Sequence, residues 1–324
     1  MAIYGCAPMN LRDLRYLTAL ADHKHFGRAA DASFASQPTL STQIKKLEDE
    51  LDVQLFERQP RKILLTRAGE AIVARARLIL REVDNIREIA RSARDPEAGR
   101  IKLGMFPTLG PYLLPHVVPA LRLRFPKLEL LLIEEKSEEL SAKLERGDID
   151  AVLLALPVAD ESFAMCELFQ EEFVLALPRE RSAEFPGEAG EGVHLSDLRE
   201  REVLLLEEGH CLRQQALSVC ELNGVSEKAG FRATSLETLR QMVAANVGVT
   251  LLPQLATLPP IPPNEYLQLR SFVEPAPRRL IGMFWRKSDA REQLMTAVAQ
   301  LLAERAQRVL GPRSAPPDVA DLNR

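Results

Sequence analysis

Apolar residues in the first part of the chain recur every three or four positions, which is the spacing of amphipathic helices. The pattern predicts a helix that starts after Asn10, a short second helix with Phe34 on its apolar side, and a third helix over 37–51. Residues 53–66 are predicted to form a small hairpin with a basic turn. Three short helices followed by a basic hairpin are typical of a winged helix-turn-helix domain.

The third predicted helix carries polar side chains off its apolar stripe. Its N-terminus and these side chains can enter a DNA groove, whereas a basic hairpin can reach phosphates. Any small helical domain has a polar face, so this interpretation depends on the order of the elements. The residues predicted to contact double-stranded DNA are Gln37, Pro38, Ser41, Thr42, Lys45, Arg58 and Arg61.

Residues 66–94 are predicted to form one long helix, because apolar residues alternate at spacings of four and three over three heptads. So narrow an apolar stripe favours pairing with a helix of a second subunit. The alternative is packing on the chain's own core. The stripe residues predicted at a dimer interface are Ile72, Ile79, Val83 and Ile86.

From residue 100 the pattern changes to continuous apolar runs that alternate with helical segments. Such runs are typical of buried strands in an α/β fold. A second set of strands and helices begins near Glu172, and a late strand over 278–287 follows it, so we predict a hinged, two-lobed ligand-binding module. Thr234 and Glu237 are expected to form a capping box at the start of a helix in the second set.

Composition excludes several classes of protein. The net charge is −4 over 324 residues, with +2 on residues 1–99 and −6 on the rest, so only the front part is mildly basic. The start lacks the features of a signal peptide and no run reaches 18 apolar residues, so we expect a soluble cytoplasmic protein with no membrane segment. Phosphate-binding loops, catalytic serine motifs, dinucleotide fingerprints and metal-ligand clusters are not found, so we predict no cofactor and no metal.

Residues 209–220 contain two of the four cysteines, nine positions apart. Cys211 is expected to open a helix, where unpaired backbone N–H groups, with His210 and Arg213, can favour its thiolate. If that helix runs through Cys220, the two cysteines lie about 13 Å apart along its axis. A disulfide requires Cα atoms within roughly 7 Å, so the pair can bond only after a rearrangement. The alternative is that both are ordinary core cysteines.

Residues 10–58 resemble the N-terminal domain of LysR-type transcriptional regulators. Residues 107–119, 209–220 and 231–253 are similar to the peroxide-sensing OxyR subfamily of that family, and the resemblance covers about residues 9 to 310. The cysteine segment is the more specific part of the likeness.

The resemblance implies that Cys211 is the peroxidatic cysteine and Cys220 the resolving one. It also implies a peroxide pocket, in which Ser137 stands where the subfamily has a threonine. The implied pocket residues are Thr108, Ser137, His210 and Arg279. Cys6 and Cys166 fall outside the matching motifs.

The resemblance therefore implies a transcriptional regulator, not an enzyme, that senses hydrogen peroxide and controls oxidative-stress defence genes as an activator. The implied partners are double-stranded DNA, hydrogen peroxide, a second subunit in a homodimer, two dimers in a homotetramer, RNA polymerase, and a thiol reductant such as glutaredoxin or thioredoxin. Two alternatives stay open: a LysR-type regulator that binds a small metabolite between its lobes, and a thiol peroxidase.

The predicted fold is multidomain, with α and α/β parts. Its parts are an extension (1–8), a winged helix-turn-helix domain (9–67), a linker dimerisation helix with a hinge (68–99), a two-lobed α/β redox-sensing domain of the periplasmic-binding-protein type (100–312) and a disordered tail (313–324).

Overall fold

A computed structural model describes residues 9–59, 62–92, 94–158, 162–186, 192–199, 201–221 and 226–314. The predicted extension with Cys6, and the tail after Ser314, lie outside these ranges. The chain forms two compact units that divide after Ala90. Within the described ranges, no helix is both long enough and apolar enough to span a bilayer.

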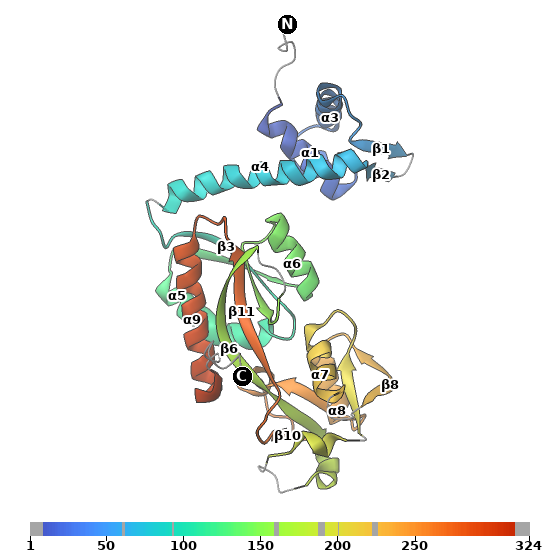
Figure 1. The fold of residues 1–324 in the computed structure, drawn as a ribbon, viewed down its shortest axis with the longest axis vertical. Helices are drawn as coiled ribbons and strands as arrows, with labels where there is room; N and C mark the ends of the chain where they lie inside the picture. The colour runs from blue at the N-terminus through green and yellow to red at the C-terminus, as the bar shows by residue number, and fades with distance from the viewer. Residues whose placement is uncertain are drawn as a thin grey trace. The chain divides into compact units, whose positions relative to one another are not determined.

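The regular elements alternate in the order that Figure 1 shows by colour. The α-helices are α1 (Leu11–His23), α2 (Phe26–Ala32), α3 (Gln37–Leu51), α4 (Arg67–Ser92), α5 (Gly110–Arg124), α6 (Ser137–Arg146), α7 (Cys211–Glu221), α8 (Leu236–Ala244) and α9 (Glu292–Leu310). The strands are β1 (Phe56–Gln59), β2 (Lys62–Leu65), β3 (Gly99–Met105), β4 (Leu128–Glu134), β5 (Ala151–Ala155), β6 (Phe163–Pro178), β7 (Glu202–Leu206), β8 (Ser226–Ala233), β9 (Thr250–Pro253), β10 (Leu267–Ser271) and β11 (Arg278–Arg286). The short 3-10 helices are η1 (Arg179–Glu184), η2 (Leu195–Leu198), η3 (Gln254–Thr257) and η4 (Pro312–Ser314).

The first unit is the predicted winged helix-turn-helix. An Asn10 capping box starts α1, and the apolar faces of α1, α2 and α3 close one core with the antiparallel β1–β2 hairpin and the first turns of α4. The prediction that Phe34 shares the apolar side of α2 is wrong. The helix ends at Ala32, and Phe34 is fully exposed in the following turn with a φ of 52°.

The second unit is built on a seven-stranded sheet. Its order is β10-β6-β11-β5-β3-β4, with β9 also pairing to β6. β3 runs parallel to β4 and β5, whereas β11 is antiparallel to both β5 and β6. Figure 1 shows α6 on one side of the first-lobe strands, with α9 and α5 packed together on the other.

One long strand connects the two lobes. β6 has 16 residues, and its first part pairs with β11 while its last part pairs with β9 and β10 of the second lobe. The second lobe also contains the parallel β7–β8 pair, α7 and α8. The predicted two-lobed architecture is confirmed, but the sequence pattern missed the half of β6 that precedes Glu172.

Two local predictions need correction. Ser235, and not Thr234, is the N-cap of α8, because Ser235 has the extended backbone of a cap and its hydroxyl accepts the Thr238 N–H at 3.2 Å. The prediction of a disordered tail from residue 313 is wrong for Arg313 and Ser314, which belong to η4. Ser314 is 3% exposed, and its hydroxyl donates to the carbonyl of Gly311 at 2.6 Å.

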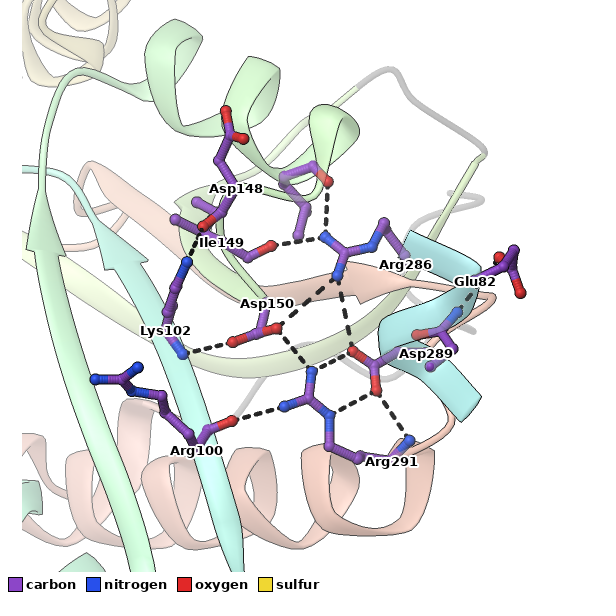
Figure 2. A network of polar contacts seen from close by, with 11 residues as sticks. Glu82, Arg100, Lys102, Asp148, Ile149, Asp150, Arg286, Asp289 and Arg291 are labelled. Carbon is purple, nitrogen blue, oxygen red and sulfur yellow. Dashed lines mark hydrogen bonds and ion pairs between the residues drawn. The ribbon is translucent and has the colours of Figure 1, made fainter. Parts of the chain in front are cut away.

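A buried ion-pair network ties together three segments of the first lobe (Figure 2). Arg291, at the start of α9, lies 2.7 Å from carboxylate oxygens of both Asp289 and Asp150. It also donates to the carbonyl of Arg100 in β3 at 2.6 Å. These bonds join the β11–α9 connection and the start of β5 to the strand that begins the regulatory domain.

Arg286 extends this network from the end of β11. Its Nη1 donates to the carbonyls of Leu144 and Ile149 at 2.8 and 2.6 Å. Asp150 in turn accepts the backbone N–H of Lys102 at 2.7 Å. We refer to Arg291, Asp289, Asp150 and Arg286 as the frame network, because each of them fixes a strand or helix end.

Candidate functional site

Cys211 is the first residue of α7, as the sequence predicts. The preceding Gly209 has a φ of 87°, a left-handed conformation that favours glycine, and it completes the turn from β7 into α7. Cys211 is a free, partly buried thiol, packed against the main core of the regulatory domain. The loop between β7 and α7 thus places the Cys211 sulfur in the protein interior, at the N-terminus of α7.

The pKa of the Cys211 thiol is raised, because burial outweighs the groups that favour the thiolate. The opposing groups are the charge of Arg279, the hydroxyl of Ser137 and the backbone N–H groups of Leu212 and Cys211 itself. The expectation that the backbone N–H groups at the helix start favour the thiolate is confirmed in direction, but their effect is not the largest one on this thiol. The helix end contributes, but desolvation is the larger effect.

Arg279 lies in β11 directly opposite Glu171 of β6, so strand pairing brings the two together. Both side chains are 0% exposed, and Arg279 Nε donates to Glu171 Oε2 at 2.7 Å. The guanidinium also donates to the Thr108 hydroxyl at 3.3 Å and to the Thr108 carbonyl at 3.0 Å. Phe106 covers it, with its ring centroid 5.3 Å away.

Glu171 is fixed in turn, because its second oxygen accepts the backbone N–H of Leu255 at 2.8 Å. Thr108 is 2% exposed. The guanidinium therefore has little freedom to move, and its positive charge acts on the Cys211 sulfur from a fixed position. A preorganised cation of this kind can stabilise negative charge that develops during a reaction.

Two buried polar atoms, one at the start of α6 and one in α7, have no hydrogen-bond partner among the described residues. Ser137 Oγ, in the first residue of α6, interacts with the Cys211 sulfur enough to lower its pKa but forms no well-aligned hydrogen bond. Gln215 Oε1 lies one helical turn after Cys211. Buried polar atoms are normally paired, so both atoms have capacity for a small polar ligand.

Gln215 and Glu171 were not predicted from the sequence. The spacing of four residues between Cys211 and Gln215 was an available signal, because residues i and i+4 share a helix face. Glu171 gave no signal, since it meets Arg279 through the pairing of strands 108 positions apart.

His210 is 6% exposed, and its pKa is lowered by burial and by the charge of Lys136, although Glu207 lies 3.9 Å from its Nε2. It is therefore neutral at pH 7. Arg213 pairs with both oxygens of Glu227, at 2.7 and 2.6 Å. The expectation that His210 and Arg213 add positive charge beside the thiol is wrong, and Arg279 supplies that charge instead.

Cys220 lies in the last turn of the same continuous helix. Nine residues separate it from Cys211, so the two Cα atoms are about 13 Å apart along the axis. The structure describes the backbone of Cys220 but not its side chain. Disulfide formation would require α7 to rearrange.

The predicted DNA-contacting side chains of α3 are accessible. Gln37, Pro38, Thr42 and Lys45 are exposed and Ser41 is partly buried, while the Ser36 hydroxyl caps the helix. The structure does not describe the side chains of the two basic residues predicted in the wing. The backbone of Arg58 lies in β1 but its side chain is not described, and Arg61 lies outside the described residues.

The apolar stripe of α4 divides into two parts. Ile72 packs on the core of its own winged helix domain. Farther along the helix, Ile79 and Ile86 are 43% and 65% exposed, and Val83 between them is partly buried. The second part is thus available for pairing, which stays a prediction.

Comparison with known families identifies both parts of the chain. Residues 11–70 match the family described as "Bacterial regulatory helix-turn-helix protein, lysR family", and residues 94–307 match "LysR substrate binding domain". The chain belongs to the LysR family of bacterial transcriptional regulators. Within the described residues, no group of His, Cys, Asp and Glu side chains could hold a metal ion.

The relatives of this chain include OxyR proteins, which form a group within the LysR family. The chain is 46% identical to the "DNA-binding transcriptional dual regulator OxyR" of Escherichia coli over 92% of this chain and 96% of that one. It is 34% identical to full-length OxyR from Pseudomonas aeruginosa, solved as a cysteine-to-aspartate variant, with a TM-score of 0.77 over 97% of this chain and all of that one. A hydrogen peroxide-bound cysteine variant of OxyR from Corynebacterium glutamicum is 31% identical, with a TM-score of 0.64 over 94% of each chain.

Proposed function

We propose that this LysR-family regulator senses hydrogen peroxide by oxidation of Cys211 and disulfide formation with Cys220. The observation that carries the proposal is the environment of the Cys211 sulfur, which is a free thiol beside the fixed charge of Arg279 and the unpaired Ser137 hydroxyl. The names of the OxyR relatives support the same function. Two hydroxyls, a cation and a thiol within one buried site suit a ligand as small and polar as peroxide.

In the first step, the Cys211 thiolate attacks one peroxide oxygen. The O–O bond breaks, the sulfur becomes a sulfenic acid, and the departing hydroxide takes a proton to form water. Arg279 stabilises the negative charge on the departing oxygen, and the hydroxyls of Thr108 and Ser137 hold the peroxide. The amide oxygen of Gln215 can accept a hydrogen bond from it. His210, neutral and adjacent to Cys211, completes the pocket wall.

In the second step, the Cys220 thiol displaces water from the sulfenic acid and a disulfide forms. Because α7 is continuous between the two cysteines, this step unfolds part of the helix. A local rearrangement in the second lobe can then change how regulatory domains pair and how the wings are spaced on DNA.

The remaining assignments extend this proposal. The exposed side chains of α3 read operator DNA, and the basic residues of the wing hold phosphates. Ile79 and Ile86 pair two subunits, and dimers associate into tetramers. The oxidised form activates defence genes through RNA polymerase in the cytoplasm, and glutaredoxin or thioredoxin reduces the disulfide.

Intact mass after stoichiometric peroxide tests the proposal. The full-length protein should lose two hydrogens, which corresponds to one disulfide. Cys211→Ser should abolish the change, whereas Cys220→Ser should leave a sulfenic acid on Cys211, visible as one added oxygen.

Cys166 provides a matched control in the same domain. It is also a free, partly buried thiol whose pKa is raised by burial and then by Glu167, and no cation of the described residues contributes to that shift. Cys166→Ser should therefore respond to peroxide as the wild type does. A Cys211→Ser protein that still lost two hydrogens would refute the proposal, and catalytic turnover with thioredoxin would favour a thiol peroxidase.

A further inference from the structure

One lysine joins the two lobes beside the redox site. Lys136 is the N-cap of α6 in the first lobe and directly precedes Ser137. Its Nζ donates to Glu207 Oε1 at 2.8 Å and to the backbone carbonyl of Glu208 at 3.0 Å. Both acceptors belong to the second-lobe loop that leads from β7 to Cys211.

The same side chain packs on this loop. A methyl group built on Gly209 would lie 3.0 Å from Lys136 Cδ and 3.2 Å from its Nζ. The left-handed backbone at Gly209 and this close approach both disfavour a side chain there. Lys136 therefore holds the loop through an ion pair, a backbone hydrogen bond and direct packing.

We infer that Lys136 is a positioning residue for the redox pair, and that its contacts favour the dithiol over the disulfide. This inference rests on the proposed function. Lys136 and Ser137 are consecutive, and the Glu208 carbonyl is three residues from Cys211, so the lysine sets how the thiol faces the Ser137 hydroxyl.

The bias follows from the geometry of α7. Cys211 and Cys220 can meet only if α7 unwinds, because about 13 Å of helix separates them, and we place this movement at the helix start, where Cys211 lies. The loop over 207–210 then moves with Cys211, and the contacts of Lys136 with Glu207 and Glu208 break. Contacts present only in the dithiol form oppose oxidation by the free energy that they contribute.

The experiment measures the redox equilibrium of the full-length protein in buffers of glutathione and glutathione disulfide. Two electrons and two protons pass from the thiols of Cys211 and Cys220 to glutathione disulfide, which yields the protein disulfide and two glutathione molecules. Lys136→Met should raise this equilibrium constant roughly two- to fivefold, the range expected for loss of a partly exposed ion pair. Lys136→Arg, which keeps the charge, should stay closer to the wild-type value.

Coupling to the partner separates this role from a general effect on stability. Glu207→Gln should shift the equilibrium in the same direction as Lys136→Met. The double variant should show no further shift, because the two residues share one interaction. Additive shifts would assign the effect to something other than their contact.

Lys143 of the same helix is a matched control. Its Nζ lies 2.5 Å from Glu135 Oε1, and both residues belong to the first lobe. Lys143→Met should leave the redox equilibrium unchanged. A wild-type constant in Lys136→Met, or an equal shift in Lys143→Met, would overturn the inference while the wild type still forms its disulfide. A wild type that formed no disulfide would refute the proposed function itself, and the inference with it.

Discussion

Two arginines of the regulatory domain are buried and paired with carboxylates, but they differ in their other neighbours. Arg291 in the frame network and Arg279 at the thiol are 7% and 0% exposed at their side chains, and each lies 2.7 Å from a carboxylate. Burial of a charge is costly unless it is paired and hydrogen-bonded. Both sites satisfy that requirement.

The two arginines differ in what else surrounds them. Arg291 is shared between the carboxylates of Asp289 and Asp150 and a backbone carbonyl, so its neighbours balance its charge. Although burial alone would raise the pKa of Asp289, its bonds to Arg291 hold that pKa below the usual range. Among the described residues, the carboxylate partner of Arg279 is Glu171. The positive charge of Arg279 also acts to lower the pKa of the Cys211 thiol.

We conclude that a buried cation can act on a ligand only where the protein's own groups leave polar atoms around it without partners. The frame network is closed by the protein's own groups. On the Arg279 side, the cation acts on the thiol of Cys211. The oxygens of Ser137 and Gln215 have no hydrogen-bond partner among the described residues, so a ligand can bond to them.

A large effect on stability is expected from Arg291→Met. Removing the arginine leaves the buried carboxylate of Asp289 and the partly buried one of Asp150 without their main partner, so the free energy of unfolding should fall by about 3–5 kcal/mol. Urea unfolding measures the change. The rate of Cys211 oxidation in the protein that remains folded should be unchanged.

Arg308→Met supplies the control for that variant. Arg308 and Glu304 form an exposed pair on α9, with side chains 63% and 57% exposed. Loss of this pair should cost less than about 1 kcal/mol. Equal destabilisation by the two variants would contradict the structural role of the frame network.

Arg279→Met should slow the reaction and also destabilise the fold, because it leaves the fully buried carboxylate of Glu171 without its cation. Loss of the fixed charge at the departing oxygen should lower the second-order rate constant with peroxide about 10²- to 10³-fold, the range seen when one electrostatic donor is removed from an active site. Stopped-flow kinetics measures it. Arg279→Lys should recover part of the rate, and a full rate in Arg279→Met would remove this residue from the mechanism.

The pH dependence should follow the raised pKa of Cys211. The thiolate is the nucleophile, so between pH 6 and 8 its rate with peroxide should rise about tenfold per unit without reaching a plateau. The folded protein holds this proton more tightly than the unfolded chain. The contribution to stability is therefore present at lower pH and is lost as the pH rises through the folded pKa. A plateau below pH 7 would contradict the raised pKa.

Ser137→Ala should have the smallest effect on stability and a clear effect on rate. Among the described residues its hydroxyl forms no well-aligned hydrogen bond, so its removal should change the free energy of unfolding by less than about 0.5 kcal/mol. The rate with peroxide should fall roughly tenfold, as expected for one lost hydrogen bond to the reacting group. Ser137→Thr should retain the wild-type rate, because it keeps the hydroxyl.

Periodicity and capping signals in the sequence predicted most of the helices and strands and their order. The heptad spacing predicted α4, the apolar runs predicted two α/β lobes, and the start of α7 at Cys211 was predicted to the residue. These features depend on interactions between residues close in the chain, so periodicity and capping preferences are enough to find them. The resemblance to the OxyR group, and not periodicity, indicated Thr108, Ser137, His210 and Arg279 as predicted pocket residues.

Only the tertiary structure decided the electrostatics of the site. The sequence indicated that the helix start favours the Cys211 thiolate and that His210 and Arg213 can add positive charge. In the structure, burial raises the pKa of this thiol and lowers that of His210, and the cation that acts on the thiol is Arg279 of β11. The contacts of Glu171 with Arg279 and of Lys136 with Glu207 likewise gave no signal in the sequence. The reason is that desolvation and charge pairing depend on which distant segments meet, and a one-dimensional pattern carries no distances between them.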